Sequence, residues 1–320
     1  TAVVILNWNG VRTGHLVHFL PGVIKHTSGD AEIIVADNKS TDNSLEWLKE
    51  HYPQIRVIEN PDNSGFASGY NNALKQVEAD YYVLLNSDIE VTENWIAPIV
   101  NMMEKDAMIA ACQPKIMNQN EGRRDEFEYA GAAGGFIDKY GYPFCRGRLF
   151  QNLEKDKGQY DDKLEVFWAT GACMFVRADL YRELGGLDDD FFAHMEEIDL
   201  CWRMKNQGYK IMYCGESSVY HVGGGTLPKK YPKKTYLNFR NNLTLLFKNL
   251  PKERLLKVYI ARILLDGIAA FKFLLEGSFM SFIAVTRAHV SFLRTYGKTM
   301  KKRRLYDHKH VSRVYWGNIV

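Results

Sequence analysis

The sequence predicts an α/β fold on a mostly parallel, doubly wound sheet, with a helical region after it. Short β-forming runs alternate with helix-compatible stretches in the first half of the 320-residue chain, and these runs are apolar throughout. Continuously apolar strands are typical of parallel sheets that are buried on both faces. The expected strands are residues 3–6, 32–36, 55–59 and 81–85, and the expected crossover helices are residues 14–25, 41–51 and 64–77.

The second half lacks this regular alternation. From residue 118 to about 165 the chain is polar, rich in glycine and without the apolar periodicity of a helix or a strand, so we expect an extended flap over a site. Order is expected to resume at residues 166–176, with helices at 178–184 and 196–206 and strands at 210–214 and 218–221. We therefore predict one domain over residues 1–230 and a mainly helical region over 231–320.

Charge is distributed unevenly along the chain. The net charge is only +3, but residues 1–220 carry 21 Lys and Arg against 34 Asp and Glu, whereas residues 221–320 carry 20 against 4. Such a basic segment favours an anionic partner, either nucleic acid or the inner face of a membrane. No zinc, helix-turn-helix or RNP-like pattern accompanies the charge, so we do not expect nucleic-acid binding.

Residues 262–276 have the pattern of an amphipathic helix. Within an arc of roughly 120° lie four charged residues, namely Arg262, Asp266, Lys272 and Glu276. The remainder of the helix is apolar: Ile263, Leu264, Ile268, Phe271, Leu274 and Leu275. The longest uncharged run of the 231–320 region, residues 277–286, is far below the roughly 20 residues that span a bilayer. The region is thus expected to lie on a membrane surface, to pack on the rest of the chain or to form an oligomer, and these alternatives are compatible.

The cysteines indicate a reducing compartment. The five are widely spaced and include no C-x-x-C pair of the kind that metal and redox sites use. Residues 2–6 form an expected strand rather than the apolar run of a signal segment. We therefore expect a cytoplasmic protein.

Polar residues follow the expected strands at the edge where open α/β sheets bind ligands. Asp37 and Asn38 follow the second strand, while Asn7 and Asn9 follow the first. Asp37 could accept hydrogen bonds from a base or ribose, although the same residue types are common in turns and helix caps. Gly65 begins a helix whose amides could approach a phosphate, or the small residues there serve packing.

The fourth strand ends in Asn86, Ser87 and Asp88, a position suited to a metal and a diphosphate. One carboxylate is not enough to hold a metal ion, so a second protein ligand is needed. His221, at the end of a late strand and next to residues 223–225, is the candidate, with a structural histidine as the alternative.

The densest acidic cluster begins the helix at residue 196. Glu197 and Asp199 compete for the role of general base, with Glu196 beside them, because the positive end of a helix favours an ionised carboxylate. Trp168, Thr170 and Gly171 combine an aromatic face with small residues, which suits a sugar, although a buried Trp is the alternative explanation.

Six segments, taken in order, resemble the family 2 glycosyltransferases. They are VILNWNG at 4–10, ADNKSTD at 36–42, GFA at 65–67, LNSD at 85–88, TGA at 170–172 and EEIDLCWR at 196–203. The resemblance covers roughly residues 1–250 and is strongest to the branch of bacterial rhamnosyltransferases and galactofuranosyltransferases. It implies a GT-A fold, a nucleotide-sugar donor, a divalent cation (Mn²⁺ or Mg²⁺) and inversion at the anomeric carbon.

The resemblance also implies roles for single residues. Asp37 would contact the nucleoside, and Asp88 would bind the metal that bridges the diphosphate, with His221 as second metal ligand. The catalytic base falls on Glu197, supported by Glu196 and Asp199. The donor site would include Asn7, Asn9, Asn38, Gly65, Asn86 and Ser87, and the acceptor site Trp168, Thr170 and Gly171. Asn86 replaces the first aspartate of the family's D-x-D motif, which leaves the metal shell poorer in negative charge.

We therefore expect an inverting transferase that moves a sugar from TDP-rhamnose or UDP-hexose to a glycan or lipid-linked acceptor in cell-surface polysaccharide synthesis. Its partners would include an anionic membrane surface, and a homo-oligomer remains open. The rival prediction is a catalytically inactive module that binds nucleotide sugar or glycan. The presence of Asp88, Glu197 and His221 argues against that rival.

Overall fold

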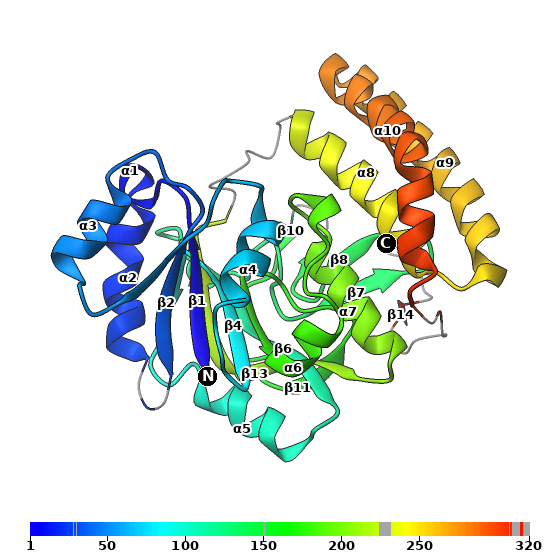
Figure 1. Ribbon diagram of the computed structural model, residues 1–320. Helices are drawn as coiled ribbons and strands as arrows, with labels where there is room; N and C mark the ends of the chain where they lie inside the picture. The colour runs from blue at the N-terminus through cyan, green and yellow to red at the C-terminus, as the bar shows by residue number, and fades with distance from the viewer. Residues whose placement is uncertain are drawn as a thin grey trace.

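A nine-stranded mixed sheet forms the centre of the molecule (Figure 1). The computed structural model describes residues 1–27, 29, 31–149, 152–223, 232–306, 308 and 314–315. The four strands on one side of the sheet are parallel, in the order β3-β2-β1-β4. Their bounds are β1 Ala2–Asn7, β2 Glu32–Asp37, β3 Arg56–Glu59 and β4 Tyr81–Asn86. All four expected strands of the first half are therefore confirmed.

The other side of the sheet mixes directions. Strand β12 runs antiparallel to both β4 and β6, while β13 runs parallel to β6 and antiparallel to β5 and β11. The bounds are β5 Ile89–Val91, β6 Ile109–Asn118, β11 Lys163–Val166, β12 Cys173–Arg177 and β13 Lys210–His221. The two strands expected at 210–214 and 218–221 are thus one strand. The prediction was wrong because a register shift between Cys214 and Ser218 interrupts the pattern but not the pairing.

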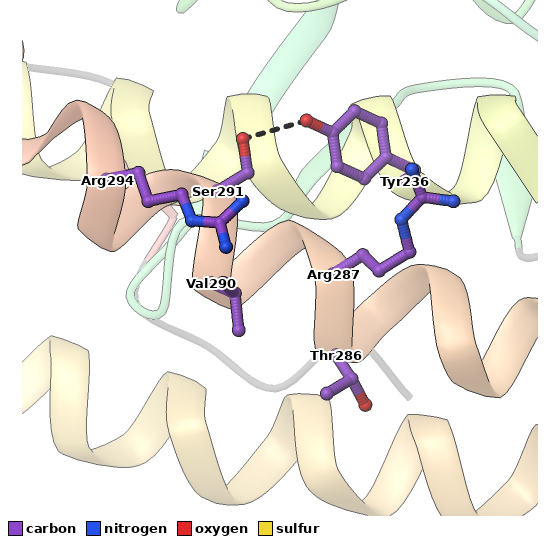
Figure 2. Close-up of a pocket in the computed structure, with 6 residues that line it drawn as sticks. All are labelled: Tyr236, Thr286, Arg287, Val290, Ser291 and Arg294. Carbon is purple, nitrogen blue, oxygen red and sulfur yellow. Dashed lines mark hydrogen bonds between the residues drawn. The ribbon is translucent and has the colours of Figure 1, made fainter.

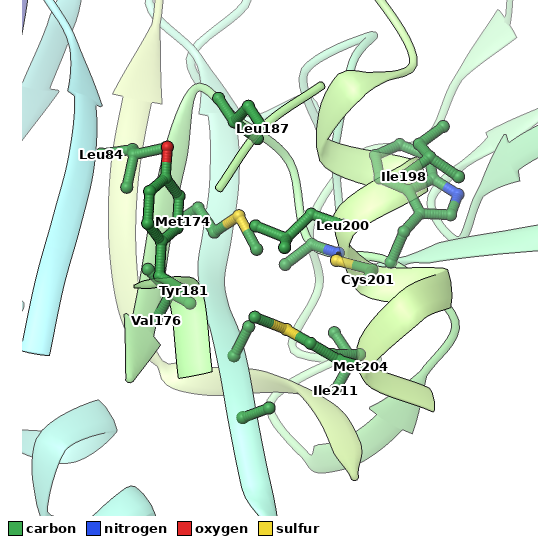
Figure 3. Close-up of a cluster of buried hydrophobic side chains, with 14 of the residues drawn as sticks. Leu84, Met174, Val176, Tyr181, Leu187, Ile198, Leu200, Cys201, Met204 and Ile211 are labelled. Carbon is green, nitrogen blue, oxygen red and sulfur yellow. Dashed lines mark hydrogen bonds between the residues drawn. The ribbon is translucent and has the colours of Figure 1, made fainter. Parts of the chain in front are cut away.

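Two hydrophobic clusters cover the two faces of the sheet. Successive residues of β1 point into different clusters: Val4 joins the one that contains Leu84 and Leu200, and Ile5 joins the other, with Leu20. Figure 3 shows the first cluster, where Leu84 and Met174 of the sheet approach side chains of α7. The helices that surround the sheet are α1 Gly10–Thr13, α2 His15–His26, α3 Ser44–His51, α4 Phe66–Leu74, α5 Ala97–Lys105, α6 Ala178–Glu183 and α7 Glu196–Asn206. Helix α7 has the bounds that the sequence predicted.

The segment expected to be an extended flap is more ordered than its composition suggested. It contains the short strands β7 Gly135–Asp138, β8 Pro143–Cys145, β9 Arg148–Leu149 and β10 Asn152–Leu153. Phe127 and Ile137 are buried in the main hydrophobic cluster. The expectation of a segment without regular structure was wrong because glycines form the tight turns between these short strands: Gly141 and Gly147 have φ angles of 84° and 90°.

Three long helices form a layer after the sheet (Figure 1). They are α8 Pro232–Asn249, α9 Lys252–Leu275 and α10 Phe279–Arg303, so the helical character predicted for this region is confirmed. Helix α10 packs on both α8 and α9, and α8 contacts α7. A short strand, β14 Val314–Tyr315, pairs in parallel with β7. In the described part of the chain, no helix is long and apolar enough to cross a membrane.

A buried ion network joins α7 to α8 and α10. The Asp199 carboxylate of α7 accepts hydrogen bonds from Arg203 Nε and Lys248 Nζ, both at 2.8 Å. Lys248 also donates to Asp188 at 2.7 Å, and Asp188 pairs in turn with Lys302 of α10. Although burial alone would raise the pKa of Asp188, Lys248 and Lys302 hold it well below the usual range. Each charge in the network is therefore compensated.

Replacement of Asp199 by Asn should destabilise the protein, because Arg203 and Lys248 would keep their buried charges and lose their shared partner. We expect the free energy of unfolding to fall by roughly 3 kcal/mol, measured by urea denaturation at pH 7. Asp80→Asn, at an exposed position, is the matched control and should change stability by less than about 0.5 kcal/mol. Equal stability of the two variants would contradict this account.

Candidate active site

The carboxyl ends of β1, β2 and β4 bring three polar residues together. The strand register places Asn7 opposite Asp37, and Leu6 opposite Asn86. Because β1 lies between β2 and β4, Asn7 occupies the middle of this edge. Residues that are far apart in the sequence thus form one row, as predicted for ligand binding in an open α/β sheet.

Asp37 lies at the centre of a hydrogen-bonded cluster. Its Oδ2 accepts from Asn7 Nδ2 at 2.9 Å and from the Ser40 hydroxyl at 2.6 Å, while its Oδ1 accepts from the Ser40 amide at 2.8 Å. Asn9 Oδ1 accepts from the amides of Thr41 and Asp42 at 2.7 and 3.2 Å. These bonds form the turn after β2. Among the described residues they leave Asn7 Oδ1 and Asn9 Nδ2 buried without a partner.

Asn38 and Gly65 join this turn to α4. Asn38 Nδ2 donates to Asn63 Oδ1 at 2.9 Å and to the Gly65 carbonyl at 3.2 Å. Gly65 has a φ of 100°, and a Cβ there would lie 2.6 Å from the Phe192 carbonyl oxygen. The Phe66 amide already donates to that carbonyl at 2.9 Å. These contacts therefore favour a packing role for Gly65 over a hydrogen bond from the Phe66 amide to a phosphate.

Strand pairing brings Asp88 and His221 into contact. The β5–β13 pair places His221 opposite Ile89, and the Val222 amide donates to the Asp88 carbonyl at 3.2 Å. His221 Nε2 lies 3.2 Å from Asp88 Oδ1. On the other side of the ring, Nδ1 lies 3.6 Å from Glu128 Oε2, which is too long for a hydrogen bond. Gly224 and Gly225, which follow in the sequence, lie outside the described residues.

The charges of this group favour an ionised Asp88 and a protonated His221. Burial alone would raise the pKa of Asp88, but His221 lowers it below the usual value. Burial alone would lower the pKa of His221, but Asp88 and Glu128 raise it to about 10. The sequence did not point to Glu128, because it lies in the segment expected to be a flap and only the fold brings it to His221.

Asp88 and His221 fit a divalent cation that is shared with a ligand. Asp88 Oδ1 and His221 Nε2 lie close enough together to bind one divalent cation, which would replace the proton that His221 carries in the absence of a metal. Within the described residues, no group of three or more His, Cys, Asp or Glu could hold a metal. A cation here would therefore take its remaining ligands from water or from phosphate oxygens.

Glu197 lies at the same edge of the sheet. The Asn86 amide donates to the Ala172 carbonyl at 2.9 Å, and a Cβ on the neighbouring Gly171 would lie 3.7 Å from the Cβ of Glu197. Glu197 is partly exposed, whereas Glu196 is buried. Contacts through Ala172 and Gly171 thus connect the end of β4 to the start of α7.

The two glutamates titrate under different conditions. Burial raises the pKa of Glu197 to about 7, although backbone amides at the start of α7 favour its ionised form. Burial and the charge of Glu197 raise the pKa of Glu196 well above the usual value. Among the described residues, Oε2 of each glutamate has no hydrogen-bond partner. Near neutral pH, Glu197 is therefore suited to accept a proton while Glu196 stays neutral.

The other predicted site residues serve the walls and supports of this site. Asp199 is fully buried in the ion network, where it faces Arg203 and Lys248. Trp168 is also buried, and its Nε1 donates to the Phe136 carbonyl at 2.8 Å, so its ring does not present an open stacking face. The Thr170 amide donates to Gln113 Oε1 at 2.9 Å. Ser87 is half-buried in the turn after β4.

A strained loop leads into α7 and is held by α8. Phe192, His194 and Met195 have positive φ angles of 64°, 71° and 78°, which cost free energy in residues other than glycine. Asn241 Nδ2 lies 2.8–2.9 Å from the carbonyl oxygens of Phe191, Ala193 and His194. Sequence reasoning missed Asn241, because nothing in a helical stretch indicates partners 47 to 50 residues away.

The fold and this edge of the sheet define an enzyme class. The mixed sheet with polar residues at its carboxyl edge is the GT-A glycosyltransferase fold, here with additional C-terminal helices. A mannosyltransferase from Pyrobaculum calidifontis, solved with GDP-Man and Mn²⁺, superposes with a TM-score of 0.55 at 14% identity, over 95% of this chain and 81% of that one. GalNAc-T7, solved with UDP, GalNAc and Mn²⁺, gives a TM-score of 0.56 at 23% identity, over 69% of this chain and 42% of that one.

The chain belongs to glycosyl transferase family 2, because the model of that family matches residues 3–185, more than half of its length. It is a glycosyltransferase. An N-acetylglucosaminyl-diphospho-decaprenol L-rhamnosyltransferase of Mycobacterium tuberculosis is 23% identical, over 65% of this chain and 71% of the relative. The rhamnosyltransferase WbbL of Escherichia coli is 22% identical, over 77% and 92% respectively. The low-salt glycan biosynthesis hexosyltransferase Agl10 of Haloferax volcanii is 25% identical, over 67% and 66%.

Asn241→Ala should loosen the loop before α7, because the carbonyls of Phe191, Ala193 and His194 would lose their shared donor. We expect faster deuterium uptake by the amides of residues 191–195 in hydrogen-exchange mass spectrometry. Asn101→Ala, on the exposed side of α5, is the matched control and should leave the uptake of this loop unchanged. Unchanged uptake in Asn241→Ala would show that Asn241 does not hold the loop.

Proposed function

We propose that this enzyme transfers a sugar from a nucleoside-diphosphate donor to a hydroxyl group of a glycan or lipid-linked acceptor, with inversion at the anomeric carbon. The observation that carries the proposal is the position of Glu197. Its carboxylate has a pKa raised to about 7, and it lies at the edge where Asp37 ends β2 and Asp88 follows β4. A base, a nucleoside site and a diphosphate site are the parts that this reaction needs.

The donor would occupy the ends of β1, β2 and β4. Asp37 and Asn38, with Asn7 and Asn9 beside them, offer hydrogen-bond partners to the nucleoside. Asn86 and Ser87 would line the diphosphate, whereas Gly65 lets α4 approach closely. Asp88 and His221 would hold a divalent cation, Mn²⁺ or Mg²⁺, whose chemistry when bound is to neutralise charge on the departing diphosphate. The Mn²⁺ present in the two related structures supports this part of the proposal.

Glu197 would act as the general base. It accepts the proton of the acceptor hydroxyl while that oxygen forms a bond to the anomeric carbon from the face opposite the diphosphate. The bond between that carbon and the diphosphate oxygen breaks, and the nucleoside diphosphate leaves with the electron pair. One displacement of this kind inverts the configuration, and no covalent enzyme intermediate is needed.

The neighbouring residues would keep Glu197 in place. Asp199 binds Arg203 and Lys248 and so fixes the first turn of α7, which makes it a positioning residue rather than a second base. Glu196, kept neutral by burial, adds no competing negative charge beside the base. Gly171 leaves space next to Glu197 for an acceptor, with Trp168 and Thr170 forming the supporting wall.

The rhamnosyltransferases among the relatives favour TDP-rhamnose as the donor over UDP-hexose. One of these relatives is named for an acceptor that carries a decaprenol diphosphate, which supports a lipid-linked acceptor in cell-surface polysaccharide synthesis. Such an acceptor would be met at the anionic inner face of a membrane, to which the basic C-terminal region is suited.

Glu197→Gln should abolish most transfer without weakening donor binding, because the amide keeps the shape of the side chain but cannot accept the proton. We expect kcat to fall at least about 100-fold, measured as nucleoside diphosphate released in the presence of acceptor. Thermal shifts with TDP-rhamnose and UDP-hexose, each with and without Mn²⁺ or Mg²⁺, would report donor binding.

The matched control for this substitution is Glu183→Gln, at an exposed position at the end of α6, which should retain wild-type activity. Donor binding without any transfer by the wild-type protein would instead support an inactive binding module. Full activity of Glu197→Gln would exclude Glu197 as the base.

The rate of transfer should also depend on pH, and it should increase as the pH rises. The base must be ionised, and its pKa is about 7, so kcat/KM should be highest above pH 7. Below that value kcat/KM should decrease, and the decrease should approach about tenfold per pH unit. The apparent pKa belongs to the coupled pair Glu196–Glu197. A pH–rate profile that is flat between pH 5 and 8, with donor binding intact, would contradict this assignment.

A further inference from the structure

Helix α9 exposes its apolar face and buries part of its charged face. Arg262 and Asp266 are 1% and 0% exposed. Eight large apolar side chains of the same helix are each at least 40% exposed, and together we call them the α9 apolar stripe: Leu256, Ile260, Ile263, Leu264, Ile268, Phe271, Leu274 and Leu275. Phe279 and Met280, at the start of α10, continue it with exposures of 57% and 58%.

The contacts of the buried face fix this orientation. Arg262 donates to Asp266 at 2.9 Å and to Asn242 of α8 at 2.5 Å. Asp266 also accepts from the Tyr142 hydroxyl at 3.1 Å and lies 3.1 Å from His289 Nε2 of α10. Rotation of α9 to bury the stripe would leave Arg262 and Asp266 without these partners. The stripe therefore faces away from the protein, at the outer side of the helical layer (Figure 1).

The dimensions of the stripe suit an interfacial helix. From Leu256 to Leu275 it extends about 28 Å at the rise of an α-helix, and on the helical wheel it occupies an arc of about 140°. Large apolar patches of this kind on a folded protein mark sites of protein or membrane interaction. Because no helix among the described residues is apolar enough to span a bilayer, the stripe is suited to lie along a membrane surface.

The charges around the stripe favour a membrane over another protein as the partner. Lys257 and Lys272 are exposed beside the stripe, where long side chains can reach lipid headgroups, and Lys272 also lies 3.7 Å from the Glu276 carboxylate. Arg287 and Arg294 of α10 line a cavity of about 270 Å³ with Ser291 and Tyr236 (Figure 2). In the described part of the chain, neither arginine forms an ion pair. A second copy of this chain would bring another basic surface to the interface, because residues 252–303, which include α9 and α10, expose seven Lys and Arg against two Glu, whereas an anionic lipid surface complements this excess.

We propose that the α9 apolar stripe inserts into the headgroup region of a membrane rich in anionic lipid, with the basic residues around it bound to lipid phosphates. The proposal extends the proposed function, in which a lipid-linked acceptor is met at a membrane. It also changes the expected mode of binding. The basic region is attracted to the membrane by its charge, and the α9 apolar stripe, whose orientation α8 and α10 fix, adds apolar insertion. Apolar insertion and charge attraction together bind the membrane more tightly than charge alone.

The test is flotation of the full chain with vesicles of phosphatidylcholine alone or with about one-third phosphatidylglycerol. Wild type should float with the anionic vesicles. The double substitution Leu264→Glu and Ile268→Glu should reduce the bound fraction at least about tenfold. The matched control is Leu293→Glu with Leu305→Glu, which makes the same change of charge at residues that are 68% and 72% exposed outside the stripe. This control should still bind.

Three outcomes would overturn the proposal: no flotation of wild type, equal loss in both double variants, or a wild-type dimer that only the Leu264/Ile268 variant dissociates in light scattering. The last outcome would identify a second copy as the occupant. Thermal shifts with TDP-rhamnose on the same samples separate this proposal from the proposed function. Donor binding without flotation would reject only the membrane site, and flotation without a thermal shift would reject only TDP-rhamnose as the donor.

Discussion

The buried ion network around Asp199 is the constraint on which the arrangement of the site depends. Asp199 is bound by Arg203 of its own helix and by Lys248 and Asn249 of α8, all at 2.8 Å. Removing one member would leave the others as uncompensated buried charges. The network therefore ties the helix that carries Glu197 to the C-terminal layer, so the C-terminal helices form part of the support of the site.

The same α8 helix also holds the loop before α7. Asn241 contacts the carbonyl oxygens of Phe191, Ala193 and His194, in a loop where Phe192, His194 and Met195 have positive φ angles. Such strain persists only where the surroundings impose it. Glu197 thus owes its position to contacts on both sides of the start of α7: the loop that α8 holds, and the ion network at Asp199, two residues further along.

Local sequence patterns were enough to predict the parallel half of the sheet and the bounds of α7. Continuous apolar runs indicate buried strands, and polar residues at their ends indicate a ligand edge, so Asn7 could be placed beside Asp37, and Asn86 at the end of a further strand, before any coordinates. Glu128, Asn241 and the fixed orientation of α9 could not be predicted in this way. Glu128 reaches His221 because its amide bonds to the Ile116 carbonyl of β6, which pairs with β13, and Asn241 reaches the 191–194 loop only because α8 packs near α7.

The sequence by itself determined the family, the polar edge of the sheet and the amphipathic character of residues 262–276, because these depend on residue types at short spacings. The tertiary structure decided which charged groups are partners and which faces are covered. A helical wheel separates charged from apolar residues but does not say which side meets the protein. In α9 that choice follows from the partners that Asn242, Tyr142 and His289 offer to Arg262 and Asp266. Buried charges require such partners, and only the fold supplies them.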